Sequence, residues 1–264
     1  MNLLTAVLLL AGVCPLTKAL RANRTTTLRQ PLGWALFAWS AWIGVAWLRL
    51  LRPGMDERLA AYGALCLTGC SGVAVLGARR PGASAWNFVV AGLLAVLLLP
   101  ILNGMGELRL EPAQEIFLAG TLLVAVLNYL PTRLGPEAVA AAVGCGWEMM
   151  RLLGWTAPTR SPWLGLFLLA LTPWTGWMAL AWGTATTEFD RLWLAHRNRF
   201  GFVWGQRTCE QFNRAAYHAG WPVVLRWNGL HATAAEPIPD PAALAAMLRA
   251  VLKRFSFEEE NAHG

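Results

Sequence analysis

Long apolar runs, separated by short polar and basic segments, dominate the first 186 residues of the chain. Six of them cover approximately residues 2–18, 31–51, 58–77, 85–102, 116–130 and 163–182. A helix needs about 20 mainly apolar residues to cross the ~30 Å hydrocarbon core of a bilayer. Each run is therefore predicted to be a transmembrane helix. For the first run, which is near the short end of this length, an interfacial helix is the alternative.

A weaker segment, residues 137–155, lies between the fifth and sixth of these runs. It is apolar over much of its length but contains Glu148 and Arg151. The segment is predicted either to cross the membrane, which gives about seven transmembrane helices, or to be a half-inserted helix, which gives six.

The last part of the chain, residues 187–264, has a different pattern. Apolar residues recur every three or four positions through 188–219, as on one face of a helix: Phe189, Trp193, His196, Phe200 and Val203. Gly201 and Gly205 allow this helix either to pack closely on a neighbour or to break. The alternation in 221–227 predicts one strand, and Asp240 followed by Pro241 is typical of the start of a helix.

Composition agrees with a membrane protein. Hydrophobic residues make up 56% of the 264 residues and charged residues only 14%, against about 25% charged in soluble domains. We therefore predict an all-α integral membrane protein, with a transmembrane bundle in residues 1–186 and a small α+β tail in 187–264. About 75 residues with one strand are too few for a substantial core of their own. The tail is thus expected to pack on the membrane face or on a partner.

Basic residues predict the orientation. The segment 18–30 contains Lys18, Arg21, Arg24 and Arg29 and no acid, whereas three glutamates lie in 103–115. Cytoplasmic loops are enriched in Lys and Arg, so the N-terminus is predicted to lie outside a bacterial plasma (inner) membrane. Seven spans then place the tail in the cytoplasm, whereas six would place it outside.

Polar residues inside the spans are the candidates for a functional site. An ionisable group in a span is costly and by default a functional hypothesis, so Glu148 is the first candidate: it could carry a proton, bind a cation or pair with Arg151. The plain alternative is an interfacial segment in which both charges meet water. Asn87 and Asn128 complete the candidate set, with interhelical hydrogen bonds as the favoured interpretation. Cys66 and Cys70, four residues apart, favour close helix packing over metal binding.

The tail helix is expected to contact lipid or a partner protein. A helix with an apolar face and arginines elsewhere can lie on an anionic membrane surface. The residues predicted to make this contact are Arg191, Trp193, Arg197, Arg199, Phe200 and Trp204.

Several chemistries lack their usual sequence signals. All four histidines lie in the tail, and HExxH, GxxxxGK[ST] and GxGxxG are absent. No cofactor, metal site, catalytic residue or nucleic-acid partner is therefore predicted. The favoured function is a non-enzymatic membrane subunit or scaffold that packs against other subunits or copies of itself in the bilayer. The alternatives are a small-molecule transporter or channel and, less favoured, an enzyme acting on lipid or quinone.

Overall fold

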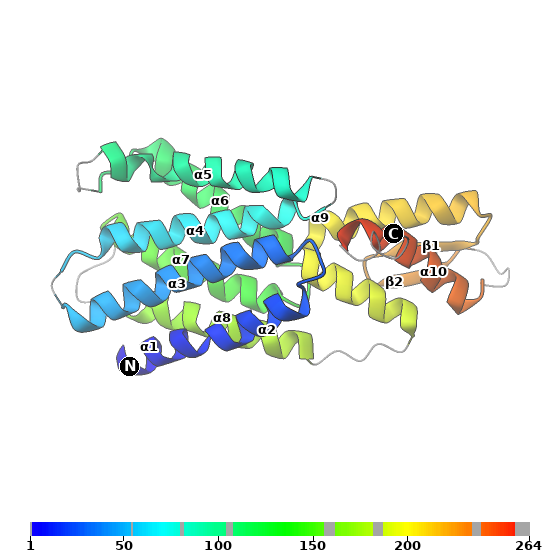
Figure 1. Ribbon diagram of the computed structural model, residues 1–264, viewed down its shortest axis with the longest axis horizontal. Helices are drawn as coiled ribbons and strands as arrows, with labels where there is room; N and C mark the ends of the chain where they lie inside the picture. Colours follow the sequence, from blue (N-terminus) through cyan, green and yellow to red (C-terminus); the bar gives the residue numbers. More distant parts are fainter. Residues whose placement is uncertain are drawn as a thin grey trace, which may run out of the picture.

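A helical bundle with a smaller tail module at one end forms the protein in a computed structural model (Figure 1). The structure describes residues 2–53, 55–79, 82–103, 108–155, 162–181, 187–233 and 239–256, so the acidic loop at 103–115 lies partly outside the described residues.

The bundle consists of α1 (Asn2–Ala11), α2 (Val13–Ala22), α3 (Arg29–Leu51), α4 (Arg58–Leu76), α5 (Ala83–Asn103), α6 (Pro112–Tyr129), α7 (Gly135–Leu152) and α8 (Leu164–Ala181). The tail consists of α9 (Glu188–His218), β1 (Val223–Arg226), β2 (Gly229–Ala232), α10 (Pro241–Leu252) and the short 3₁₀ helix η1 (Lys253–Phe255).

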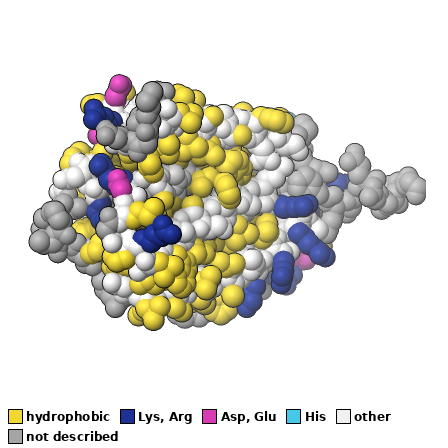
Figure 2. All heavy atoms as spheres, turned by 60° about the vertical axis from the view of Figure 1, so that its left-hand side comes forward, with side chains coloured by type: hydrophobic (Ala, Val, Ile, Leu, Met, Phe, Trp, Pro, Cys, Tyr) yellow, Lys and Arg dark blue, Asp and Glu magenta, His cyan; other side chains and the backbone are white. Residues whose placement is uncertain are grey.

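Six segments of the described chain are long and apolar enough to cross a membrane. They are the joined α1–α2 segment and helices α3, α4, α5, α6 and α8. The all-α, multi-pass membrane bundle predicted from the apolar runs is confirmed at this level. Figure 2 shows a broad hydrophobic surface with charged side chains gathered toward its two ends. Helix α7 is 18 residues long and packs against α4, α6 and α8.

Helix α4 lies at the centre of the bundle and contacts α3, α5, α6 and α7. A Cβ at Gly72 would lie 2.2 Å from the Cβ of Ala125, so only glycine lets α4 and α6 approach this closely. On its other side, the Sγ atoms of Cys66 and Cys70 each lie 3.9 Å from backbone carbonyls of α5. This is the packing arrangement of small residues that membrane helices use.

Tryptophan side chains join α3 to its neighbours. The Trp42 indole N–H donates to Thr68 Oγ1 on α4 at 2.9 Å, and the Trp39 N–H donates to the Leu9 carbonyl on α1 at 2.8 Å. Buried indoles usually find such a partner, so these residues bind helices together rather than mark the membrane interface.

The tail contains a β-hairpin and its own small core, so the expectation of a single strand was wrong. Strand β2 pairs antiparallel with β1 through a two-residue turn, with Arg226 opposite Gly229. Its sequence, GLHA, has neither a run of β-branched residues nor a clear alternation, which is why it was not predicted. The hairpin packs with α9 and α10 around Trp193, Phe212 and Leu225.

Helix α9 is broken at Gly201, where φ is +81° and ψ is −167°. Figure 1 shows that the two arms of α9 diverge from this break like the sides of a V. The break at Gly201, called the elbow below, lies against the ends of the bundle helices. Gly205 serves close packing, because a Cβ there would lie 2.6 Å from the Trp227 ring. Both roles considered for these glycines are therefore present.

The tail is fixed to the bundle by hydrogen bonds at several points. The Trp204 indole donates to the Val75 carbonyl of α4 at 2.9 Å, and the Trp227 indole donates to the Pro131 carbonyl after α6 at 3.0 Å. Thr27, which precedes α3, donates its backbone N–H to the Phe255 carbonyl at 3.0 Å. The tail thus packs on the ends of the chain's own bundle helices, and its expected contact with the membrane face or with a partner stays a prediction.

Candidate functional site

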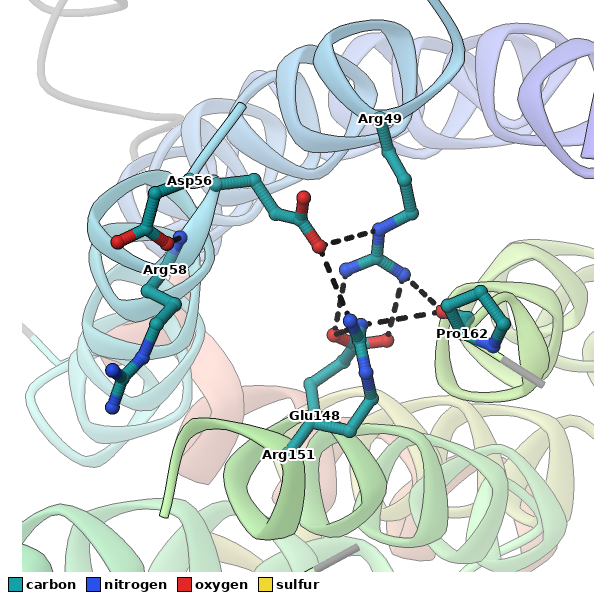
Figure 3. Close-up of polar contacts among 7 residues, drawn as sticks. Arg49, Asp56, Arg58, Glu148, Arg151 and Pro162 are labelled. Carbon is teal, nitrogen blue, oxygen red and sulfur yellow. Dashed lines mark hydrogen bonds and ion pairs between the residues drawn. The ribbon is translucent and has the colours of Figure 1, made fainter. Parts of the chain in front are cut away.

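Four charged side chains meet at the end of the bundle opposite the tail (Figure 3). Arg49 comes from the last turn of α3, Glu148 and Arg151 from the last turns of α7, and Glu57 from the residue before α4. Cations are stabilised near helix C-termini by the helix dipole, which favours both arginines at these positions.

Arg49 and Glu148 form a bidentate ion pair. Nη2 of Arg49 lies 3.0 Å from Oε2 of Glu148, and Nη1 donates to Oε1 at 3.4 Å. The side chains are only 6% and 1% exposed, respectively. Water is therefore almost excluded from the pair, and each charge depends on its protein partners for stabilisation.

Glu57 and Arg151 complete the cluster. Arg151 donates to Glu148 at 3.1 Å and to Glu57 at 3.2 Å, while Nε of Arg49 lies 3.0 Å from the Glu57 carboxylate. Both guanidinium groups also donate to the backbone carbonyl of Pro162, just before α8. Two arginines thus neutralise two glutamates, and the cluster joins α3, α7 and the segments that precede α4 and α8.

Gly165 of α8 and Trp163, the residue before this helix, shape the same site. A Cβ at Gly165 would lie 2.7 Å from Oε1 of Glu148, so a larger residue there would displace the carboxylate. The Arg49 guanidinium lies 5.8 Å from the centre of the Trp163 ring, within the range of a cation–π interaction.

Two cavities lie at this end of the bundle. The smaller, about 30 Å³, is lined by all four charged residues together with Arg58, Ala61 and Leu152, and a polar space of this size can hold a water molecule. The larger, about 280 Å³, is lined by Arg58, Leu108, Arg109, Leu110, Glu115, Leu152 and Leu153. Figure 3 shows Arg58 directed away from the ion pairs, and its Nη2 donates to the Leu152 carbonyl at 2.7 Å.

The arrangement is suited to holding helices together. Within the described residues, no group of three or more His, Cys, Asp or Glu side chains is placed to hold a metal ion. The cluster contains no serine, threonine, cysteine or lysine, and each of its carboxylates is paired with both guanidinium groups.

The structure brings together only part of the site predicted from sequence. Glu148 and Arg151 pair, which was one of the roles considered for Glu148. Asn128 lies at the other end of the bundle, where it bonds to α9. Asn87 accepts a hydrogen bond from the Trp34 indole at 3.2 Å. The asparagines thus make the interhelical hydrogen bonds that were favoured for them.

Sequence reasoning missed Arg49 and Glu57. Arg49 lies near the end of one apolar run and Glu57 just before the next, and the Arg49–Glu148 pair joins positions 99 residues apart. The available signal was an arginine inside the apolar run 31–51, for which a buried acidic partner could have been sought.

The face of α9 predicted to contact lipid is largely internal. Trp193, Phe200 and Trp204 are 0%, 5% and 8% exposed, because the hairpin, α10 and the ends of α3 and α4 cover them. Arg197 donates to the Trp227 carbonyl at 2.7 Å and stacks on the Trp227 ring. Burial lowers the pKa of Arg197 from its usual value. For these four residues the contacts are within the chain.

The two other arginines of this predicted set remain at the surface. The side chain of Arg191 is 71% exposed, and Arg199 is also exposed. Contact of Arg191 and Arg199 with lipid or a partner stays a prediction.

His196 is a buried titratable group within the described part of the tail. It is stacked on Phe200, lies 2.9 Å from the Thr208 hydroxyl across the break in α9, and contacts Phe255. Burial lowers its pKa to about 4, because the charged imidazolium would lose its hydration there. It therefore serves as a neutral packing residue, as its place on the apolar face of the helix suggested.

Comparison of the chain with models of protein families, with curated proteins and with solved structures finds no match.

Proposed function

We propose that the protein is a non-enzymatic integral membrane subunit, or scaffold, of a larger assembly in a bacterial plasma membrane. The observation that carries this proposal is the separation of the polar residues in the spans. Glu148 is held by Arg49 and Arg151, while Asn128 and Asn87 bond to different neighbours elsewhere. A transport path or an active site would require such groups to converge on one cavity.

The edge formed by α5 and α6 supports a role in assembly. Only 17% of each of these spans is buried within the chain, against 56% for α4. Large apolar side chains lie along this edge, including Phe88 at 81% exposure and Ile116 at 73%. Without a partner they face lipid, and in an assembly they are the surface on which helices of another subunit would pack.

Seven spans with the tail in the cytoplasm form part of the proposal. Helix α7 packs against α4, α6 and α8, and an 18-residue helix is about 27 Å long. Four exposed basic residues, Lys18, Arg21, Arg24 and Arg29, lie at the end of the bundle that carries the tail. The positive-inside rule then supports a cytoplasmic tail and an outside N-terminus.

Photo-crosslinking in native membranes tests the proposal. A photoreactive amino acid replacing Phe88 on α5 is expected to form an adduct with another polypeptide. The comparison position is Leu4, which is 56% exposed and belongs to α1, the helix on the opposite edge of the bundle from α5 in Figure 1. Adducts with lipid alone at both positions would contradict the proposal.

A small-molecule transporter is the second candidate, and the larger cavity at the same end of the bundle as the ion pairs is the observation that favours it. The cavity of about 280 Å³ is large enough for a small solute and shares Arg58 and Leu152 with the cavity at the ion pairs. Solute flux into vesicles that is lost in Glu148→Gln, with the fold retained, would favour transport over the scaffold.

A further inference from the structure

The elbow of α9 exposes two apolar side chains beside the break at Gly201. Phe202 and Val203 are 41% and 37% exposed, although the neighbouring Phe200 and Trp204 are buried. Val203 is held against the bundle, because its backbone N–H donates to Asn128 Oδ1 on α6 at 3.1 Å. The exposure is therefore a fixed property of the docked tail.

The elbow lies level with the last turns of the bundle helices. Asn128 belongs to the last turn of α6, and Val75, whose carbonyl accepts from Trp204, belongs to the last turn of α4. The exposed apolar face of α6 reaches the same level, since Leu127 and Leu130 are 54% and 48% exposed. In a bilayer this level is the boundary between hydrocarbon and headgroups.

Phe202 extends the lipid-facing surface of α6. Its ring centre lies 5.6 Å from that of Trp227, and the Trp227 indole donates to the carbonyl of Pro131, the residue after Leu130. Trp227 thus connects the apolar surface at the end of α6 to Phe202 at the elbow.

Arginines flank the apolar tip on both arms. Arg199 lies two residues before Gly201, and Arg207 lies one helical turn after Val203, and both are exposed. The acidic residues of the first arm, Glu188 and Asp190, lie at its far end. Basic side chains next to an apolar surface are what interfacial helices present to anionic lipids.

We propose that the α9 elbow is a lipid-binding wedge: Phe202 and Val203 enter the headgroup–hydrocarbon boundary, and Arg199 and Arg207 bind anionic lipid phosphates. This inference depends on membrane embedding and not on the scaffold function. The wedge would fix the tail to the membrane surface in addition to its contacts with α4 and α6.

Spin labelling of the full chain in vesicles tests insertion. Labels are placed at Val203→Cys and, in a second protein, Phe202→Cys, in a Cys14→Ser background, because the four other thiols are buried. Leu123→Cys on the exposed face of α6 is the lipid control, and Tyr217→Cys, 81% exposed in the second arm of α9, is the aqueous control. Collision rates with oxygen and with a water-soluble nickel complex are compared at each position.

The elbow labels are expected to resemble the label at 123, with nickel collision several-fold lower than at 217. Labels at both 202 and 203 that collide with nickel as freely as the label at 217 would overturn the wedge. A foreign protein cannot account for protection here, because the vesicles contain only this chain and lipid.

The role of the arginines is tested in the same vesicles, with and without phosphatidylglycerol. Anionic lipid is expected to increase the depth of the label at 203 in the bilayer. The double substitution Arg199→Gln/Arg207→Gln is expected to abolish that increase. Arg214→Gln, at an exposed position further along the same arm, is the matched control and should leave it unchanged. Equal depth in both lipid mixtures would overturn phosphate binding by Arg199 and Arg207.

Discussion

Asn128, on a bundle helix, completes the backbone hydrogen bonding on both sides of the break at Gly201. Its Oδ1 accepts from the Val203 N–H at 3.1 Å, and its Nδ2 donates to the Phe200 carbonyl at 3.4 Å. A helix interruption leaves such backbone groups without partners, and leaving them unsatisfied when buried is costly. One amide side chain thus couples the geometry of the tail to the end of α6.

Substituting Gly201 tests this coupling from the side of the tail. Gly201→Ala is expected to destabilise the protein by about 2–4 kcal/mol, because its φ and ψ values are nearly restricted to glycine and the new Cβ would meet Asn128. A Cβ at this position would lie 2.2 Å from Asn128 Nδ2. Unfolding by SDS in mixed micelles measures the change.

Gly220→Ala is the matched control for Gly201→Ala. Gly220 also has positive φ, at +68°, but its Cβ would meet nothing within 4 Å. Gly220→Ala should therefore lower the free energy of unfolding only by the cost of a positive φ for alanine, about 1 kcal/mol. Equal losses for the two variants would show that contact with Asn128 contributes nothing.

Removing the amide tests the coupling from the side of the bundle. Asn128→Leu is expected to loosen the tail selectively, because the two backbone groups beside the break would each lose a hydrogen bond worth about 1 kcal/mol. Amide hydrogen exchange should rise in 199–204 and leave α3 and α4 protected. Unchanged exchange around the elbow would contradict the role given to Asn128.

The cluster around Glu148 predicts a non-additive mutational effect. Glu148→Gln should destabilise the bundle by about 3–5 kcal/mol, because it leaves the buried Arg49 charge without its main partner. The double substitution Arg49→Met/Glu148→Met removes both charges and should cost markedly less than either single change. Arg151→Gln is the milder comparison, since the Arg151 side chain is 24% exposed. If the loss of stability in the double variant equals the sum of the losses in Arg49→Met and Glu148→Met, the two residues are not a coupled pair.

His196 predicts a pH dependence in the acid range. Its pKa is about 4 in the folded protein and 6.5 in its unperturbed state, so between these values the unfolded chain binds more protons. Stability should therefore fall as the pH drops from 6.5 toward 4, by up to about 3 kcal/mol. His196→Phe should flatten this slope, whereas His218→Asn, at an exposed position, should not. An identical slope in His196→Phe would assign the pH dependence to other groups.

The bundle could be predicted because its signal is local. Each apolar run is a continuous stretch with the length of a span. A helix surrounded by lipid and other helices can be apolar on all sides, so the run is recognised without finding a polar face. Even Glu148 stands out within one segment, and its partner Arg151 is one turn away on the same helix.

The contacts that organise the site and the tail could not be predicted in the same way. Arg49 meets Glu148 only because α3 and α7 end at the same level, and nothing within either run specifies this neighbour. Asn128 and Gly201 are likewise joined by tertiary packing. The apolar face of α9 correctly indicated burial, but periodicity alone does not say whether lipid or the chain's own hairpin covers that face.

The most direct test of the scaffold is the mass of the intact particle after gentle extraction from native membranes, with identification of the polypeptides it contains. The expected mass is well above that of the 28.8 kDa chain, with other subunits present in fixed stoichiometry. A particle that contains this chain alone, as a monomer or a homo-oligomer, and that still transports a solute would contradict the scaffold function.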